Sequence, residues 1–128
     1  MTLILLDTSV VIALRKSDDA HHQSAVDALA SFKGEVAIAA ITLTESLIQP
    51  MRRSGAKGRE AALTITSAVD HIYDFTTPLA VKAAEIRSTQ NLTVADAMIS
   101  ATALAHTAQL WTCDAGLAKV HKGARLLA

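Results

Sequence analysis

The chain has 128 residues, with 12 basic and 12 acidic side chains that give a formal net charge of zero at neutral pH. A neutral chain has no overall field to draw it to nucleic acid or to an anionic membrane, so any basic surface must be local. No apolar run reaches the ~18 residues of a membrane span, and the N-terminus lacks a signal-peptide pattern. The lone Cys113 cannot form an intramolecular disulfide, so we expect a cytoplasmic protein. The length of the chain predicts one domain over residues 1–128.

Short apolar runs alternate with longer amphipathic segments along the whole chain. The runs do not alternate with polar residues, which is typical of strands buried on both faces of a sheet. Thr8 and Ser9 are expected to cap the first helix, Thr77 followed by Pro78 to begin the fifth, and Thr93 to begin the sixth. In chain order we predict a strand over 3–6, helices over 10–15 and 22–32, a strand over 36–39, helices over 42–51 and 60–69, a strand over 71–75, helices over 77–88 and 93–106, and strands over 110–112 and 124–127.

Two aspartates follow predicted strands. Strands that alternate with helices predict an α/β fold with a mostly parallel sheet, in which ligands bind at the carboxyl ends of the strands. Asp7 comes directly after the first strand, and Asp114 comes just after the strand at 110–112. We therefore expect both side chains at the same edge of the sheet.

Two further acids are predicted near the starts of helices. Glu45 and Asp96 each lie three residues after a threonine, Thr42 and Thr93, in the first turn of a predicted helix. This spacing also fits a capping box, in which the acid only stabilises the start of its helix. Asp7 and Asp114 have a similar alternative as turn residues.

Taken together, the four acids predict a metal centre. Carboxylates within a few ångströms of one another repel unless a cation neutralises them. A cluster of oxygen ligands without cysteine or histidine favours Mg²⁺ or Mn²⁺ over zinc. Such a cation acts mainly on phosphates, where it polarises the phosphoryl oxygen and activates water.

Four short segments also carry a family resemblance. LLDTSVVIAL, TLTESL, VADAMISATALAH and LWTCDAGL resemble, in this order, the acidic motifs of the PIN-domain nucleases. The size and motif order resemble most closely the small bacterial toxins of the virulence-associated protein C (VapC) family, over essentially the whole chain. The resemblance implies a three-layer α/β/α sandwich around a mostly parallel sheet of four to five strands. It also implies a homodimeric endoribonuclease toxin that depends on Mg²⁺ or Mn²⁺, hydrolyses RNA and is inhibited by a cognate antitoxin.

The resemblance assigns roles to residues of this chain. Family members often follow the last acid with a further polar residue and an aromatic one, and neither is present after Asp114, so this acid matches the family least well. The implied metal-binding and catalytic acids are Asp7, Glu45, Asp96 and Asp114, with Ser9 and Thr112 as supporting hydroxyls.

RNA binding requires basic residues that contact phosphates. The densest group surrounds Gly55 and Gly58 in a predicted turn, and a solvated turn is the alternative interpretation. Arg15 and Lys16 are further candidates for RNA binding, with a solvated surface as the alternative. The predicted RNA-binding residues are Arg52, Arg53, Lys57 and Arg59.

Two other functions remain open. One is a Mg²⁺-dependent phosphatase or phosphoacceptor domain with Asp7 as the nucleophile, although the segment from Asp7 to Ser9 lacks the second acid that such domains usually have. The other is a PIN-like module that binds RNA or a protein without cutting. The intact set of four acids favours the nuclease over this binding module.

Overall fold

The computed structural model describes residues 2–128 and contains one five-stranded sheet. Every pairing is parallel, and the carboxyl ends of the strands therefore meet at one edge. This confirms the predicted α/β class and mostly parallel sheet. The strands are β1 (Leu3–Leu6), β2 (Glu35–Ala39), β3 (His71–Tyr73), β4 (Gln109–Thr112) and β5 (Arg125–Leu126), in the spatial order β3-β2-β1-β4-β5.

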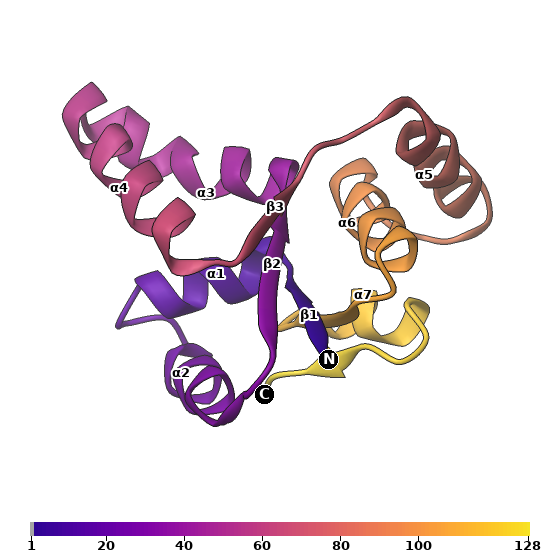
Figure 1. Ribbon diagram of the computed structural model, residues 1–128, viewed down its shortest axis with the longest axis horizontal. Coiled ribbons are helices and arrows are strands. Elements are labelled where there is room, and N and C mark those ends of the chain that lie inside the picture. The colour runs from indigo at the N-terminus through magenta and orange to yellow at the C-terminus, as the bar shows by residue number, and fades with distance from the viewer. Residues whose placement is uncertain (1) are drawn as a thin grey trace.

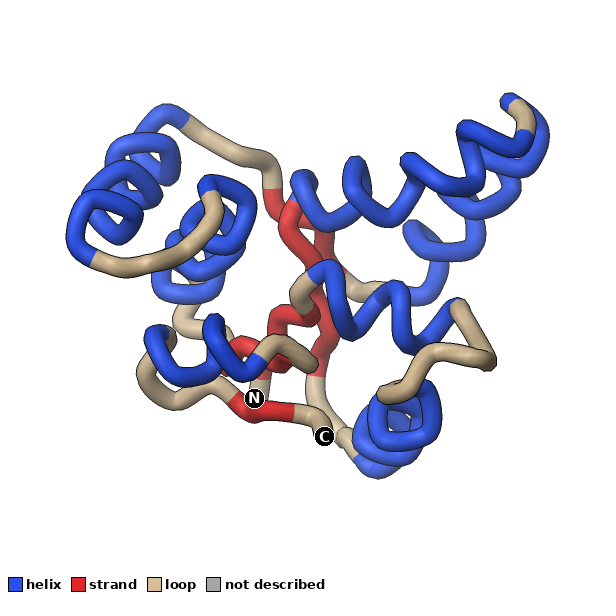
Figure 2. The backbone as a smooth tube through the Cα atoms, turned by 180° about the vertical axis from the view of Figure 1, so that it is seen from behind, coloured by secondary structure: helices blue, strands red, loops and turns tan. Residues whose placement is uncertain are grey.

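Helices cover both faces of the sheet (Figures 1 and 2). One side carries α1 (Thr8–Arg15), α2 (His22–Ser31), α3 (Ala40–Arg53) and α4 (Gly55–Ala68). The other side carries α6 (Val94–Ala105) and α7 (Ala115–Val120), with α5 (Thr77–Thr89) packed against α6. The arrangement is the three-layer sandwich that the family resemblance implied.

The central strand explains why its sequence is apolar without alternation. Ile4 and Leu6 join a core cluster that includes residues of α1 and α2, whereas Leu5 joins a cluster with residues of α6 and α7. All three side chains are at most 2% exposed. A strand covered on both faces has no position for a polar side chain, so the run ends only where the sheet ends.

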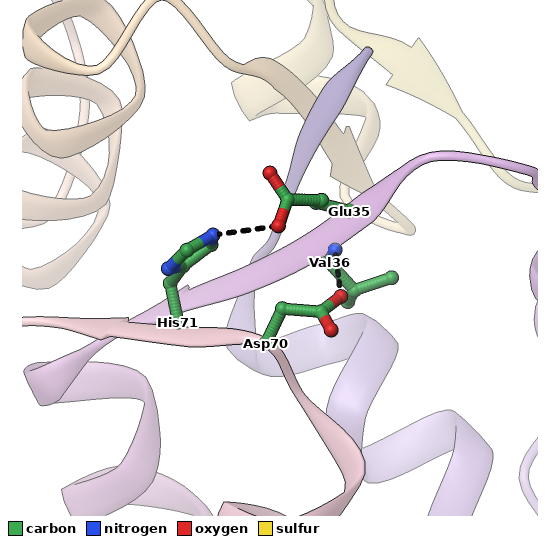
Figure 3. A network of polar contacts seen from close by, with 4 residues as sticks. All are labelled: Glu35, Val36, Asp70 and His71. Carbon is green, nitrogen blue, oxygen red and sulfur yellow. Dashed lines mark hydrogen bonds and ion pairs between the residues drawn. The ribbon is translucent and has the colours of Figure 1, made fainter. Parts of the chain in front are cut away.

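The short strand β3 is held by polar contacts at the amino ends of the strands (Figure 3). The Asp70 carboxylate accepts a hydrogen bond of 2.8 Å from the backbone N–H of Val36. The backbone N–H of Asp70 donates in turn to the carbonyl of Val36, also at 2.8 Å. His71 Nε2 lies 3.2 Å from Glu35 Oε2. These contacts set the register of β3 on β2 at the edge opposite the predicted acids.

Several helices begin at residues other than those predicted. The N-cap of α1 is Asp7, whose side chain accepts from the backbone of Val10, so the cap assigned to Thr8 and Ser9 is wrong. The N-cap of α5 is Thr76 rather than Thr77. Helix α6 begins as predicted, because the Thr93 hydroxyl accepts from the backbone N–H of Asp96.

Helix α3 begins earlier than predicted and has no side-chain cap. Its N-cap is Ala39, and Thr42 is completely buried inside the helix. Glu45 therefore lies beyond the first turn, and the capping-box alternative for this residue is wrong.

The predicted basic turn is helical. Helix α3 continues to Arg53 and α4 begins at Gly55, so only Ser54 separates them. Gly58 is buried where α4 crosses α3, and a Cβ there would lie 2.1 Å from the sulfur of Met51, so close packing rather than turn flexibility accounts for this glycine. None of the helices within residues 2–128 is long and apolar enough to cross a membrane.

Candidate functional site

Asp7 lies where β1 ends, and its backbone N–H donates to the carbonyl of Trp111 in β4 at 3.0 Å. Its carboxylate is 3% exposed and has three donors. Oδ1 accepts from Ser9 Oγ at 2.5 Å and from the backbone N–H of Val10 at 3.1 Å, and Oδ2 accepts from Thr112 Oγ1 at 2.5 Å. Both oxygens of the buried carboxylate that ends β1 thus accept hydrogen bonds and are oriented by their neighbours.

The hydroxyls of Ser9 and Thr112 join the end of β1 to the loop after β4. Thr112 Oγ1 accepts from the backbone N–H of Asp114 at 2.9 Å while donating to Asp7. Ser9 Oγ accepts from the backbone N–H of Cys113 at 2.9 Å. Both side chains predicted to support the acids therefore contact Asp7 directly and fix the adjoining loop.

Glu45 projects from α3 towards the start of α1. Its Oε1 accepts a hydrogen bond of 2.6 Å from Thr8 Oγ1, which also lies 3.3 Å from Thr42 Oγ1. The sequence interpretation missed Thr8 as a site residue, because its place beside Asp7 suggested a helix cap. The one available signal was its position directly after the first acid.

Asp114 and Asp96 are the N-terminal acids of α7 and α6. Asp114 caps α7, accepting at Oδ1 from the backbone N–H groups of Gly116 at 2.8 Å and Leu117 at 3.4 Å. Helix α7 itself was not predicted. Asp96 lies in the first turn of α6 and is partly buried.

The electrostatics show that the four acids share one environment. Burial raises the pKa of Asp7, against the opposing effect of hydrogen bonds from Ser9, Thr112 and Val10, and the charge of Asp114 adds to the rise. Burial also raises the pKa of Asp96, and Thr93 opposes this. The carboxylates that raise the pKa of Asp96 further are those of Asp114, Asp7 and Glu45. Four negative side chains therefore act on one another at the carboxyl edge of the sheet.

The donor set of this acidic edge fits a hard divalent cation. All four side chains offer carboxylate oxygens, and a cation between them would relieve their mutual repulsion. Within residues 2–128, no three histidine, cysteine or carboxylate groups converge closely enough to enclose an ion. Asp7 and Glu45 are instead held by hydroxyl donors, so the acids are electrostatic neighbours rather than a closed cage.

The predicted basic residues separate into two groups. A groove of about 460 Å³ between α1, α3 and α4, here called the basic groove, is lined by Arg53 and Lys57 but not by Arg52 or Arg59. Arg15 and Lys16 from α1 line it as well, and so does Glu45. The basic groove therefore adjoins the acidic edge.

Comparison with known proteins agrees with this geometry. The family model for the PIN domain matches residues 4–123. Ribonuclease VapC29 of Mycobacterium tuberculosis is 33% identical over 125 residues, which cover 92% of this chain and 90% of the relative.

Solved structures share the fold. The crystal structure of M. tuberculosis VapC20, described as a sarcin-ricin loop cleaving toxin, is 26% identical with a TM-score of 0.77, over 91% of this chain and 93% of that one. A toxin-antitoxin complex from Klebsiella pneumoniae superposes with a TM-score of 0.80 at 23% identity, over 98% of each chain. The family model over residues 4–123 and the 33% identical relative show that the chain belongs to the PIN-domain family and, within it, to the VapC group.

Proposed function

We propose that this protein is a metal-dependent endoribonuclease and the toxin of a toxin-antitoxin pair. The observation that carries the proposal is the position of four acids around the carboxyl edge of one parallel sheet, with the buried carboxylate of Asp7 oriented by Ser9, Thr112 and the backbone of Val10. Such a cluster is costly to fold and is useful only where it binds a cation or moves protons. The relatives that carry the name ribonuclease or toxin support the same reaction.

Asp7, Glu45, Asp96 and Asp114 would hold Mg²⁺ or Mn²⁺. When bound, the cation supplies charge stabilisation at the phosphate and lowers the pKa of water. Hydrogen bonds from Ser9, Thr112 and the Val10 backbone fix both oxygens of Asp7 before RNA arrives. Preorganised ligands of this kind do not have to reorient during the reaction.

One of the four carboxylates acts as the general base. It accepts a proton from the attacking water as the oxygen bonds to phosphorus. The bond from phosphorus to the 3′ oxygen breaks, and the leaving oxygen takes a proton from solvent water, which leaves a 3′-hydroxyl and a 5′-phosphate.

The proposed partner is a cognate antitoxin. Several structural neighbours were solved as toxin-antitoxin complexes, among them the complex from K. pneumoniae and FitAB bound to a DNA fragment. An active nuclease free in a cell would cut host RNA, so an inhibitor made beside it fits the proposed activity.

Cleavage of total cellular RNA tests the nuclease. The purified chain is incubated with Mg²⁺, with Mn²⁺ or with a chelator, beside Asp7→Asn, Asp96→Asn and the control Asp27→Asn, which changes an exposed acid of α2. We expect discrete cuts that require the cation and fall at least about a hundredfold in the two site variants. The control should cut like the unmodified chain.

Three other outcomes would contradict the proposal. Full activity of both site variants would mean that the acidic edge does not take part in the reaction. A phosphoryl group trapped on Asp7 would indicate the phosphoacceptor alternative. RNA binding without any cutting would leave a binding module.

A further inference from the structure

We propose that the basic groove binds the phosphodiester backbone of the RNA substrate and delivers the strand to the acidic edge. The proposal rests on the nuclease function and assigns part of its substrate site. It separates Arg53 and Lys57, which line the groove, from Arg52 and Arg59, which belong to the same helical hairpin but do not line it.

The groove has basic side chains on opposite walls. Arg15 is the last residue of α1 and Lys16 is its C-cap, whereas Arg53 ends α3 and Lys57 lies in the first turn of α4. These cations outnumber the groove carboxylates four to two. Because the chain as a whole is neutral, this is a local excess of positive charge, as a polyanion requires.

These cations are not engaged by other side chains. The ion pairs found within residues 2–128 are His71 with Glu35 and Lys82 with Glu85, and neither pair is in the groove. All four groove cations are exposed. Their charge is therefore available to phosphate oxygens without the loss of an internal contact.

The groove is continuous with the acidic edge through Glu45. This residue lines the groove and is held by Thr8, the neighbour of Asp7. Phosphates repeat along an RNA strand, so a strand with one phosphate at the acidic edge must place the next ones beside it. The groove offers cations at that location.

Ser46 provides a second, independent observation. It lines the groove next to Glu45 and is only 7% exposed, and its Oγ is buried without a hydrogen-bond partner within residues 2–128. A buried hydroxyl without a partner is unusual, so the wall of the groove beside Glu45 holds a hydrogen-bonding group that no other residue uses.

The lining also indicates which part of RNA is bound. No aromatic residue lines the groove, so bases cannot stack there in the manner of single-strand binding proteins. Arginine and lysine side chains bind phosphates without reading the base sequence. The groove therefore contributes affinity and position rather than sequence specificity.

A matched pair of double variants tests this site. Arg53→Ala with Lys57→Ala removes two groove cations, and Arg52→Ala with Arg59→Ala removes two cations of the same hairpin outside the groove. Each pair is placed in an Asp7→Asn background, so that RNA stays intact. Affinity for a fluorescent, mixed-sequence, single-stranded RNA is then measured over a series of salt concentrations.

We expect the groove pair to lose at least about tenfold in affinity and its salt slope to fall by about 1.4, because each phosphate contact in single strands contributes about 0.7. The reference pair should retain its affinity and slope. Arg53→Lys with Lys57→Arg, which preserves both charges, should restore binding. All four side chains are exposed, so the thermal unfolding midpoints should be unchanged.

Equal losses in both pairs, or no loss in either, would overturn the groove site. Unchanged RNA affinity in the groove pair with weakened capture of the antitoxin co-expressed from the neighbouring gene would make the groove a protein-binding site. Different results would contradict the nuclease proposal and the groove proposal. Groove-dependent RNA binding without cleavage by the unmodified chain would contradict only the reaction, and cleavage without groove dependence would contradict only this site.

Discussion

Thr112 uses one hydroxyl group to hold two acidic residues. It donates to the carboxylate of Asp7 and accepts from the backbone N–H of Asp114, and its side chain is completely buried. Loss of the hydroxyl leaves a buried carboxylate short of one donor and a loop amide without its acceptor. Each of these groups is costly to leave unsatisfied.

We therefore predict that Thr112→Val, which keeps the shape of the side chain, lowers the free energy of unfolding by about 1–3 kcal/mol. It should also lower the rate of RNA cleavage. Urea denaturation and the cleavage assay measure the two effects. Thr44→Val is the control, because Thr44 is exposed on α3 and its hydroxyl makes only a 3.4 Å contact with the Ala40 carbonyl. Equal unfolding midpoints for the two variants would contradict the prediction.

At the scale of residues, the sequence indicated the acids and the two hydroxyls that contact Asp7, but not the hydroxyl that contacts Glu45. Asp7 and Asp114 follow strands, and this pattern is readable without a structure. The partner of Thr8 is Glu45, which is 37 residues away and reaches it only because α3 packs beside α1. No local pattern contains that contact, so the nearest local role, a helix cap, was assigned instead.

At the scale of elements, a buried hydrogen bond joins α6, which has Asp96 in its first turn, to α7, which has Asp114 as its N-cap. Ser100 Oγ of α6 lies 2.6 Å from Nδ1 of His121, the C-cap of α7, and both side chains are at most 6% exposed. Burial lowers the pKa of His121 below the ordinary imidazole value of 6.5. The folded protein therefore holds this imidazole neutral.

We predict that His121 contributes a loss of stability in mild acid. As the pH falls below about 6.5, the unfolded chain protonates His121 before the folded chain does. The stability that depends on neutral His121 therefore declines below about pH 6.5 and is fully present above it. His121→Gln should flatten this dependence in urea titrations between about pH 7.5 and about pH 5.5. His106→Gln, at an exposed histidine, should retain it. An unchanged slope in His121→Gln would rule out this source of the effect.

Two elements were misjudged from sequence for identifiable reasons. Glycines at 55 and 58 are typical of a turn, but α4 begins at Gly55, and Gly58 allows α4 to pack against Met51. Here packing between two helices overrides local preference. Helix α7 has only six residues, too few for a hydrophobic period, and its cap is a residue already interpreted as catalytic.

At the scale of the whole molecule, an apolar surface is left open on the side of α5 and α6. A groove of about 430 Å³ there is lined by Phe75, Val94 and Met98 among others, and Val94 is 65% exposed. We expect this surface to form the homodimer implied by the family resemblance, because exposed apolar patches often mark interfaces.

Light scattering tests this interface. Ala84→Lys places a charged side chain in the α5–α6 groove and should convert a dimer to monomers. Leu63→Lys is the matched control, because Leu63 is 72% exposed on α4, across the sheet, and its substitution should leave the mass unchanged. A dimer that persists in Ala84→Lys would place the interface elsewhere.

The fold class was accessible from sequence because its signal is repeated along the chain. Apolar runs without alternation, separated by helical segments, predict a parallel sheet wherever they occur. The strand order is a different matter. The strand order requires β1 to pair with both β2 and β4. This pairing depends on how the helices pack on both faces of the sheet, and no single segment of the sequence determines it.

The central place of β1 has a consequence for synthesis of the protein. Strand β1 pairs with β4, which is synthesised much later, and the hydrogen bond from Thr112 to Asp7 spans 105 positions of the chain. A nascent chain that has emerged as far as β3 has Asp7 and Glu45 but neither Asp96 nor Asp114. The acidic edge is therefore complete only after Asp114 has left the ribosome, and we expect chains that stop before Asp114 to be inactive. An inhibitor made at the same time has the full period of translation to accumulate before each new molecule becomes active.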